Sequence, residues 1–178
     1  MPAQLAWAIF FAPIASFLIC GLIIRPFFNR CSRWAGYVTI AAVGISFVLS
    51  VWTLFTVNAT GPLPLPPIDW WNVGPIHIEI GLVVDPLTAI MLVVVSLVAL
   101  LVQVYSQGYM HGDPGYVRYY AWMSLFTASM LGLVLAGNLL MMYVFWELVG
   151  LCSYLLIGVW FHRPSAANAA KKAFLVTR

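Results

Sequence analysis

Long apolar runs constrain the fold of this chain more than any other feature of its sequence. Five of them approach or exceed the roughly 20 residues that an α-helix needs to cross a hydrocarbon core. They cover about residues 3–24, 34–57, 86–105, 119–137 and 138–161. Only 7% of the 178 residues are charged, whereas soluble domains carry about 25%. The sequence therefore predicts an all-α polytopic membrane protein with five transmembrane helices.

The basic residues predict how these helices are oriented. If the chain crosses the membrane five times, all eight Lys and Arg residues fall on one side. The connection at residues 58–84, on the other side, carries acids and no cation. By the positive-inside rule the cationic side is the inner one. We therefore expect the N-terminus on the outer side of a bacterial inner membrane or of an organellar energy-transducing membrane. The net charge of +3 is then a topology signal and gives no indication of nucleic-acid binding.

The outer connection predicts extended structure. It opens with TGPLPLPPIDWWNVGP, which is too rich in proline for a helix, and continues with IHIEI. In that segment Ile76, Ile78 and Ile80 alternate with polar residues, which is the period of a strand. We expect a short outer strand or hairpin between the second and third helices. Asp85 and Pro86 then suit the N-cap and first turn of the third helix, so Asp85 is predicted to be a structural cap.

Span 119–137 is predicted to pack closely against another helix of the bundle. Small residues recur in it at intervals of four: Ser124, Ala128, Gly132 and Ala136. Such a stripe lets two helices approach each other closely. Tyrosines also gather before and at the start of this span: Tyr109, Tyr116, Tyr119 and Tyr120. They predict an aromatic belt at the inner membrane interface.

Cysteine usage predicts neither a disulfide framework nor a metal site. The three cysteines, Cys20, Cys31 and Cys152, are widely spaced, and two of them lie inside spans. The sequence also lacks a Gly-rich phosphate loop, paired histidines and a CxxC motif. We therefore expect no cofactor and no catalytic redox residue in this chain.

One carboxylate interrupts the last apolar run. Glu147 stands near the middle of NLLMMYVFWELVGLCSYLLIGVWF, residues 138–161. An ionised acid at that depth costs a few kcal/mol, so it is expected to face the bundle interior and to find a partner, a proton or water. Its helix face also carries Tyr143, Gly150, Tyr154 and Gly158, which would leave room for water. We interpret Glu147 as a proton carrier; the alternative is a fixed structural pair between helices.

A sixth helix is expected to start at residues 165–178. The stretch SAANAAKKAFLVTR has an N-cap candidate in Ser165, good helix formers, and Lys171 and Arg178 on one face. No Lys, Arg or His elsewhere in the sequence lies at the depth of Glu147. We therefore expect the partner of Glu147 in a C-terminal remainder of the same protein, of which this chain would be the N-terminal portion.

Three stretches resemble the antiporter-like membrane subunit of respiratory complex I, called chain 5 or L. They are DPLTAIM, YSQGYMHGDPGYVRYYAWMSLFTASMLGLVLAGNLL and FWELVGLCSYLLIGVWFHRPSAANAAKKAFLVTR. The resemblance is dense from about residue 85 to residue 178 and looser before it. It implies a subunit of about 14 core helices with two inverted five-helix repeats, broken helices and a long lateral helix.

The resemblance also implies a role for particular residues. Glu147 matches the essential glutamate in the family's fifth helix, whose partner lysine lies on a later broken helix that matches nothing in this sequence. Lys171, Lys172 and Arg178 match the family's AAxKAF…R stretch. The match implies a supporting electrostatic role for Arg178, whose alternative is a cation that snorkels to the inner surface. Lys171 and Lys172 are interpreted first as topology and lipid-headgroup contacts, and Lys171, Tyr143 and Tyr154 are further supporting candidates. NADH, FMN, iron–sulfur clusters and quinone are then expected in other subunits.

These features lead to one functional expectation and two alternatives. The chain is expected to be a proton-translocating subunit of a complex-I-type NADH:quinone oxidoreductase, with other membrane-arm subunits and lipids as its partners. One alternative is the large subunit of a multisubunit sodium/proton antiporter or an inorganic-carbon uptake complex. The other is a membrane scaffold that does not transport.

Overall fold

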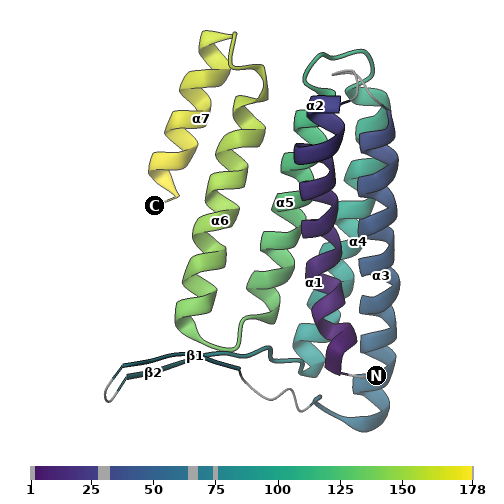
Figure 1. Ribbon diagram of the computed structural model, residues 1–178, viewed down its shortest axis with the longest axis vertical. Helices are drawn as coiled ribbons and strands as arrows, with labels where there is room; N and C mark the ends of the chain where they lie inside the picture. The colour runs from purple at the N-terminus through teal and green to yellow at the C-terminus, as the bar shows by residue number, and fades with distance from the viewer. Residues whose placement is uncertain (1–2, 28–32, 64–67, 74–75, 178) are drawn as a thin grey trace.

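A computed structural model describes residues 3–27, 33–63, 68–73 and 76–177 of the chain. It is a helical bundle with a two-stranded hairpin at one end (Figure 1). The helices are α1 (Ala3–Leu18), α2 (Arg25–Phe27), α3 (Trp34–Thr60), α4 (Pro86–Tyr109), α5 (Tyr116–Leu135), α6 (Leu139–Ile157) and α7 (Pro164–Val176). A π-helical segment, Ile19–Ile24, extends α1, and a 3₁₀ turn, Gly158–Trp160, extends α6. Cys31 lies outside the described residues.

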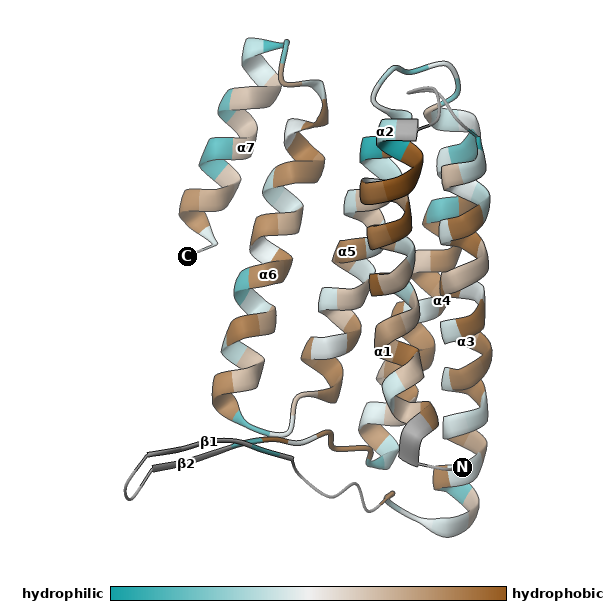
Figure 2. Ribbon diagram, in the orientation of Figure 1, coloured by the Kyte–Doolittle hydropathy of each residue, from teal (hydrophilic) through white to brown (hydrophobic). Residues whose placement is uncertain are grey.

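Four of the described helical segments are long and apolar enough to cross a membrane. They are Leu5–Ile24, Trp34–Thr60, Pro86–Tyr109 and Leu139–Trp160. The remaining predicted span, 119–137, falls on α5. This helix has 20 residues but is less apolar, because its first turns carry an arginine and three tyrosines. Figure 2 shows hydrophobic residues along the helices and hydrophilic ones gathered near their ends.

The bundle exposes apolar side chains and buries polar ones. Phe55 and Leu101 are 69% and 60% exposed, whereas Ser46, Ser96 and Gln103 are fully buried. A soluble protein shows the opposite pattern, because water favours polar side chains at its surface. The chain is accordingly a multi-pass membrane protein.

Helix α5 forms the centre of the bundle. It packs against α1, α3, α4 and α6, and twelve of its 20 residues are buried. The predicted small-residue stripe serves two of these contacts. Ser124 Oγ donates a 2.9 Å hydrogen bond to Pro13 O of α1, and Gly132 accommodates the Phe145 ring of α6.

Pro13 interrupts the hydrogen bonding of α1. Proline has no N–H group and therefore cannot donate to the carbonyl four residues earlier, which belongs to Ile9. Ser46 Oγ of α3 donates to that carbonyl instead, at 3.0 Å. The proline thus creates an acceptor inside the membrane that a neighbouring helix satisfies.

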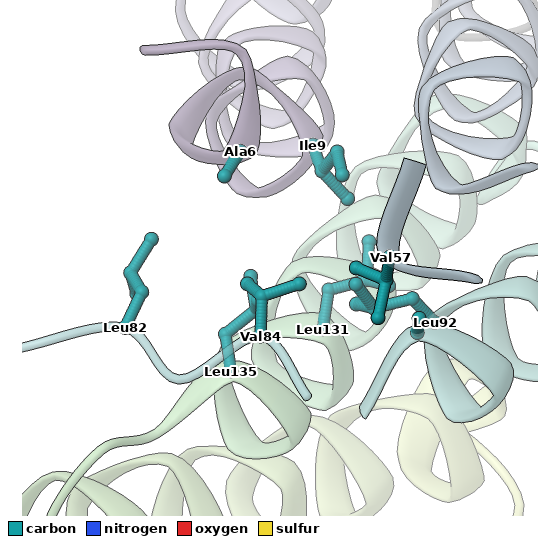
Figure 3. Close-up of a cluster of buried hydrophobic side chains, with 9 residues drawn as sticks. Ala6, Ile9, Val57, Leu82, Val84, Leu92, Leu131 and Leu135 are labelled. Carbon is teal, nitrogen blue, oxygen red and sulfur yellow. The ribbon is translucent and has the colours of Figure 1, made fainter. Parts of the chain in front are cut away.

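The hairpin pairs β1 (Ile68–Val73) with β2 (Ile76–Ile80) in antiparallel register. Its base is joined to the connection between α5 and α6. Val83 N donates to Leu135 O at 3.1 Å, and Gly137 N donates to Gly81 O at 3.0 Å. A Cβ on Gly137 would lie 2.5 Å from that same oxygen, so this approach requires glycine. Figure 3 shows the apolar cluster at this end, where Leu82 and Val84 approach Leu135.

Helix α4 begins as its sequence predicts. Asp85 Oδ1 accepts a 2.6 Å hydrogen bond from Thr88 N, and Pro86 occupies the first turn. This bond holds the pKa of Asp85 below its usual value of 3.8, because it stabilises the carboxylate. Asp85 is therefore a structural cap.

Two local predictions are wrong. Tyr116 and Tyr120 are buried, at 5% and 0% exposure, and do not form an interface belt. Tyr120 OH instead donates to Gln103 O of α4 at 2.8 Å. Ser165 does not cap α7, which starts one residue earlier at Pro164, because proline is well suited to a first helical turn.

Candidate functional site

Helix α6 places Glu147 near the middle of the membrane-length segment Leu139–Trp160. Asn138 Oδ1 starts the helix by accepting a 2.7 Å hydrogen bond from Met141 N. Glu147 is the ninth of the 19 residues of α6 and is partly buried. Its carboxyl group is therefore far from both ends of the segment.

One face of α6 is fixed against α5. A Cβ on Gly132 of α5 would lie 2.5 to 2.7 Å from three ring atoms of Phe145, so the ring fills the space that the glycine leaves. One turn beyond Glu147, Cys152 is fully buried, with its Sγ 3.8 Å from Ser129 Oγ. These contacts set the position and rotation of the helix that carries Glu147.

The glycines on the Glu147 face of α6 lie against α7. A Cβ on Gly158 would lie 3.5 Å from the Cβ of Ala170, and one on Gly150 would lie 3.6 Å from Thr177 Oγ1. Figure 1 shows α7 folded back along α6. The two glycines therefore provide a packing surface for α7, and the space for water beside Glu147 stays a prediction. Glu147 lies about one helical turn before Gly150, the residue that lies against Thr177.

The two tyrosines predicted to support Glu147 have different environments. Tyr154 is partly buried, and its ring centroid lies 5.3 Å from that of Phe174 on α7. Tyr143, one turn before Glu147, is 60% exposed. Tyr154 thus anchors α7, whereas Tyr143 lies at the surface of the described structure.

Of the predicted cations at the end of the chain, the structure describes the lysines of α7. Lys171 and Lys172 are both exposed on that helix. Arg178 lies outside the described residues. Because Ala170 faces α6, the neighbouring Lys171 lies about 100° around the helix from that contact.

Sequence reasoning missed a buried amide in α4. Gln103 is fully buried, and its Nε2 and Oε1 have no hydrogen-bond partner among the residues that the structure describes. Its backbone oxygen accepts from Tyr120 OH. The signal was available, because an amide inside the apolar run at residues 86–105 is as unexpected as a carboxylate.

Two family models match the sequence. NADH-ubiquinone oxidoreductase (complex I), chain 5 N-terminus, matches residues 70–120. NADH:quinone oxidoreductase/Mrp antiporter, TM, matches residues 136–178. The second match contains Glu147 and all of α7.

Curated relatives match the chain over nearly its whole length. It is 51% identical to NAD(P)H-quinone oxidoreductase subunit 5, chloroplastic, of Mesostigma viride, over 99% of this chain and 28% of that protein. It is 44% identical to NAD(P)H-quinone oxidoreductase chain 5 of Synechocystis sp., over 98% of this chain and 26% of that protein. The chain thus spans about a quarter of the length of these relatives.

Two solved structures share the fold. One is the membrane-bound sulfane sulfur reductase, an archaeal respiratory membrane complex, with a TM-score of 0.80 at 18% identity, covering 97% of this chain and 34% of that one. The other is the Mrp complex from Dietzia sp., with a TM-score of 0.67 at 29% identity, covering 94% of this chain and 17% of that one. The chain therefore shares its fold with these two respiratory and Mrp complexes, and in sequence it resembles the N-terminal part of the antiporter-like chain 5 of complex I.

Proposed function

We propose that this chain is part of a proton-translocating membrane-arm subunit in a complex-I-type NADH:quinone oxidoreductase. The observation that carries the proposal is the 51% identity to a subunit 5 protein over 99% of the chain. Quinone reduction, which would use NADH, FMN and iron–sulfur clusters in other subunits, supplies the energy. This chain contributes a proton-binding group inside the membrane.

Glu147 is the proton-binding group in this proposal. It is partly buried halfway along α6, on the face where α7 packs. An ionised carboxylate inside a membrane costs a few kcal/mol, and protonation removes that cost. A change in its surroundings can therefore drive proton uptake or release. Such a change need be worth only about 1.4 kcal/mol to alter the protonation ratio tenfold.

Helix α7 is the element that could alter those surroundings. Its contacts with the α6 segment include the surroundings of Gly150 and Gly158 and the ring pair of Tyr154 and Phe174. A shift of α7 would move Lys171 relative to Glu147, and Arg178 would add to this field as a second supporting cation.

The proposal includes five membrane spans with the N-terminus outside. Helix α5 would span the membrane in addition to the four segments named above. Its lower apolarity would be tolerated because it lies inside the bundle and not against lipid. Four described arginines, Arg25, Arg33, Arg118 and Arg163, lie at the end opposite the hairpin, which would be the inner side. Cysteines placed at Glu79 and at His162 should react with an impermeant maleimide from opposite sides of sealed vesicles. Reaction from the same side would refute this topology.

The second candidate is the large subunit of a sodium/proton antiporter complex. The fold match to the Mrp complex, at a TM-score of 0.67 and 29% identity, is the observation that favours it. The two candidates differ in what drives transport. Proton movement that needs quinone reduction supports the complex I subunit, whereas proton movement driven by a sodium gradient alone supports the antiporter.

The test is Glu147→Gln in the intact complex, because glutamine keeps the size of the side chain but cannot bind a proton. Proton uptake into sealed inverted vesicles and quinone reduction are measured together, and assembly is followed on native gels. We expect an assembled complex that moves fewer protons per electron. Glu79→Gln is the matched control, since it removes an exposed acid of the hairpin, and it should pump normally.

Other outcomes separate the remaining roles of Glu147. Assembly with unchanged protons per electron would refute the proton-carrier role. Loss of assembly in Glu147→Gln would indicate a fixed structural pair and a scaffold function. Glu147→Asp keeps a titratable group, so partial recovery of pumping in that variant would support proton binding itself.

A further inference from the structure

A cleft opens at the end of the bundle opposite the hairpin. It has a volume of about 650 Å³ and is lined by the end of α1, by α2, by the start of α5 and by the end of α6. Its ionisable side chains are Arg25, Asp113, Arg118 and His162. None of them has a part in the proton-binding site, which lies farther along α6.

Arg118 is held rigidly at the floor of this cleft. Its Nη2 donates a 2.7 Å hydrogen bond to Val159 O at the end of α6. The centre of its guanidinium lies 5.2 Å from the Trp122 ring and 4.9 Å from the Phe161 ring. Its Nε is buried and has no hydrogen-bond partner among the described residues. The hydrogen bond and the two ring contacts thus hold the guanidinium in place beside the cleft.

The acid of the cleft is already occupied by hydrogen-bond donors. Asp113 Oδ1 accepts from Gly115 N at 2.6 Å, and its Oδ2 accepts from Trp160 Nε1 at 2.8 Å. Both oxygens are therefore engaged in holding the α4–α5 connection to the end of α6. Arg25 also lines the cleft and is exposed. Two guanidinium groups against one engaged carboxylate leave the cleft with an excess of positive charge.

An apolar groove of about 210 Å³ continues from the cleft along α1 and α5. The two cavities share lining residues: Gly21, Leu22, Arg25, Val117 and Arg118. Deeper in the groove the lining is apolar, with Phe17, Leu18, Ala121 and Trp122. A Cβ on Gly21 would meet no atom within 4 Å, so the groove is open at that point.

We propose that the cleft and groove together bind one anionic membrane lipid. Its phosphate group lies between Arg25 and Arg118, and one acyl chain follows the groove between α1 and α5. A free phosphate ion would use the cations but leave the apolar groove empty. A neutral lipid would fill the groove but leave the excess positive charge of the cleft without a partner. Only a molecule with an anionic head and an apolar tail matches both parts.

The test is photolabelling of the assembled complex in nanodiscs with a phosphatidylglycerol that carries a diazirine on one acyl chain. Mass spectrometry should place the label on residues 17–25 and 115–122. Unlabelled phosphatidylglycerol should compete, whereas phosphatidylcholine and inorganic phosphate should not. Arg25→Gln should weaken labelling about fivefold, which is the effect of one surface cation on anionic-lipid binding. Lys172→Gln, a matched loss of an exposed cation, should leave labelling unchanged.

A second variant fills the groove and keeps both cations. Gly21→Leu should remove the label even when the complex assembles normally, because the leucine side chain takes the space of the acyl chain. Equal labelling by a phosphatidylcholine analogue would refute the role of charge. Competition by inorganic phosphate would show a small-anion site, and cross-links from the groove to another polypeptide would show a protein partner; either result would overturn the lipid assignment.

Discussion

The contact between Gly132 and Phe145 sets the position of α6, and Gly132→Ala tests it. The substitution adds a single methyl group to α5 at a point where the Phe145 ring of α6 fills the space. That ring cannot easily move away, because it also packs edge-on against Phe10 of α1, with ring centroids 5.3 Å apart. Glu147, the proposed proton-binding group, lies two residues beyond Phe145 on the same helix, so a displacement of α6 at Phe145 also moves Glu147.

The structure gives the size of the effect. The added Cβ would lie 2.5 Å from the ring, whereas ordinary contacts begin at 3.4 Å, so α6 or the ring must move by about 1 Å. Overpacking of this kind costs about 1–3 kcal/mol. Gly44→Ala in α3 is the matched control, since its nearest neighbour, Leu100 Cδ1, would be 4.0 Å away. Both substitutions gain the same helix propensity of about 1 kcal/mol. The difference in stability between the two alanine variants therefore gives the packing cost at Gly132.

The assay is the half-life of the intact complex on heating in detergent, followed on native gels. A packing cost of 1 kcal/mol corresponds to an inactivation about fivefold faster than in Gly44→Ala. Adding Phe145→Leu to Gly132→Ala should recover most of this loss, because the smaller side chain vacates the space. Equal half-lives for the two alanine variants, or no recovery in the double variant, would refute the reasoning.

Three further predictions concern single hydrogen bonds. Ser46→Ala should destabilise the complex to heat by about 0.6 kcal/mol and at most about 1.7 kcal/mol, the average and the maximum measured for hydrogen bonds between membrane helices. Adding Pro13→Ala should restore stability, since an alanine N–H can donate to the same carbonyl. The cap made by Asp85 should lose its stabilising effect as the pH falls through its lowered pKa, below 3.8. Asp85→Asn, which also caps well, should remove that pH dependence of thermal stability. Asn138→Asp should keep the cap of α6 but lose the hydrogen bond from Nδ2 to Glu79 O, so the hairpin should be cleaved faster in limited proteolysis.

Patterns that depend on single helices could be predicted from the sequence. Four of the five apolar runs correspond to the membrane-length segments of α1, α3, α4 and α6, because the thickness of a membrane fixes the length of a spanning helix. Asp85 caps α4 because an N-cap needs only residues three apart in the chain. The small-residue stripe of α5 likewise indicated close packing, and Ser124 and Gly132 contact two different helices.

Features that depend on neighbouring helices could not be read in this way. Tyr116 and Tyr120 follow the composition of an interface belt, but α5 lies at the centre of the bundle and carries them inside. Gly150 and Gly158 could be assigned to the Glu147 face of their helix, but their contacts with the segment of α7 and Thr177 could not be foreseen. In each case helical periodicity gave the face of the helix, whereas only the packing of the other helices decided what covers it.

The joined base of the hairpin also bears on how the chain is assembled in the membrane. Residues 81–83 leave the ribosome well before residues 135–137, to which they are hydrogen bonded in the folded protein. Roughly 50 residues lie between these two segments, so at about 5–20 residues per second the second segment is synthesised some seconds after the first. During that interval Val83 N and Gly81 O lack the partners that they have in the folded protein. These two hydrogen bonds can form only after α5 has been made, so the base of the hairpin is completed at the same stage as the start of the helix that carries Glu147.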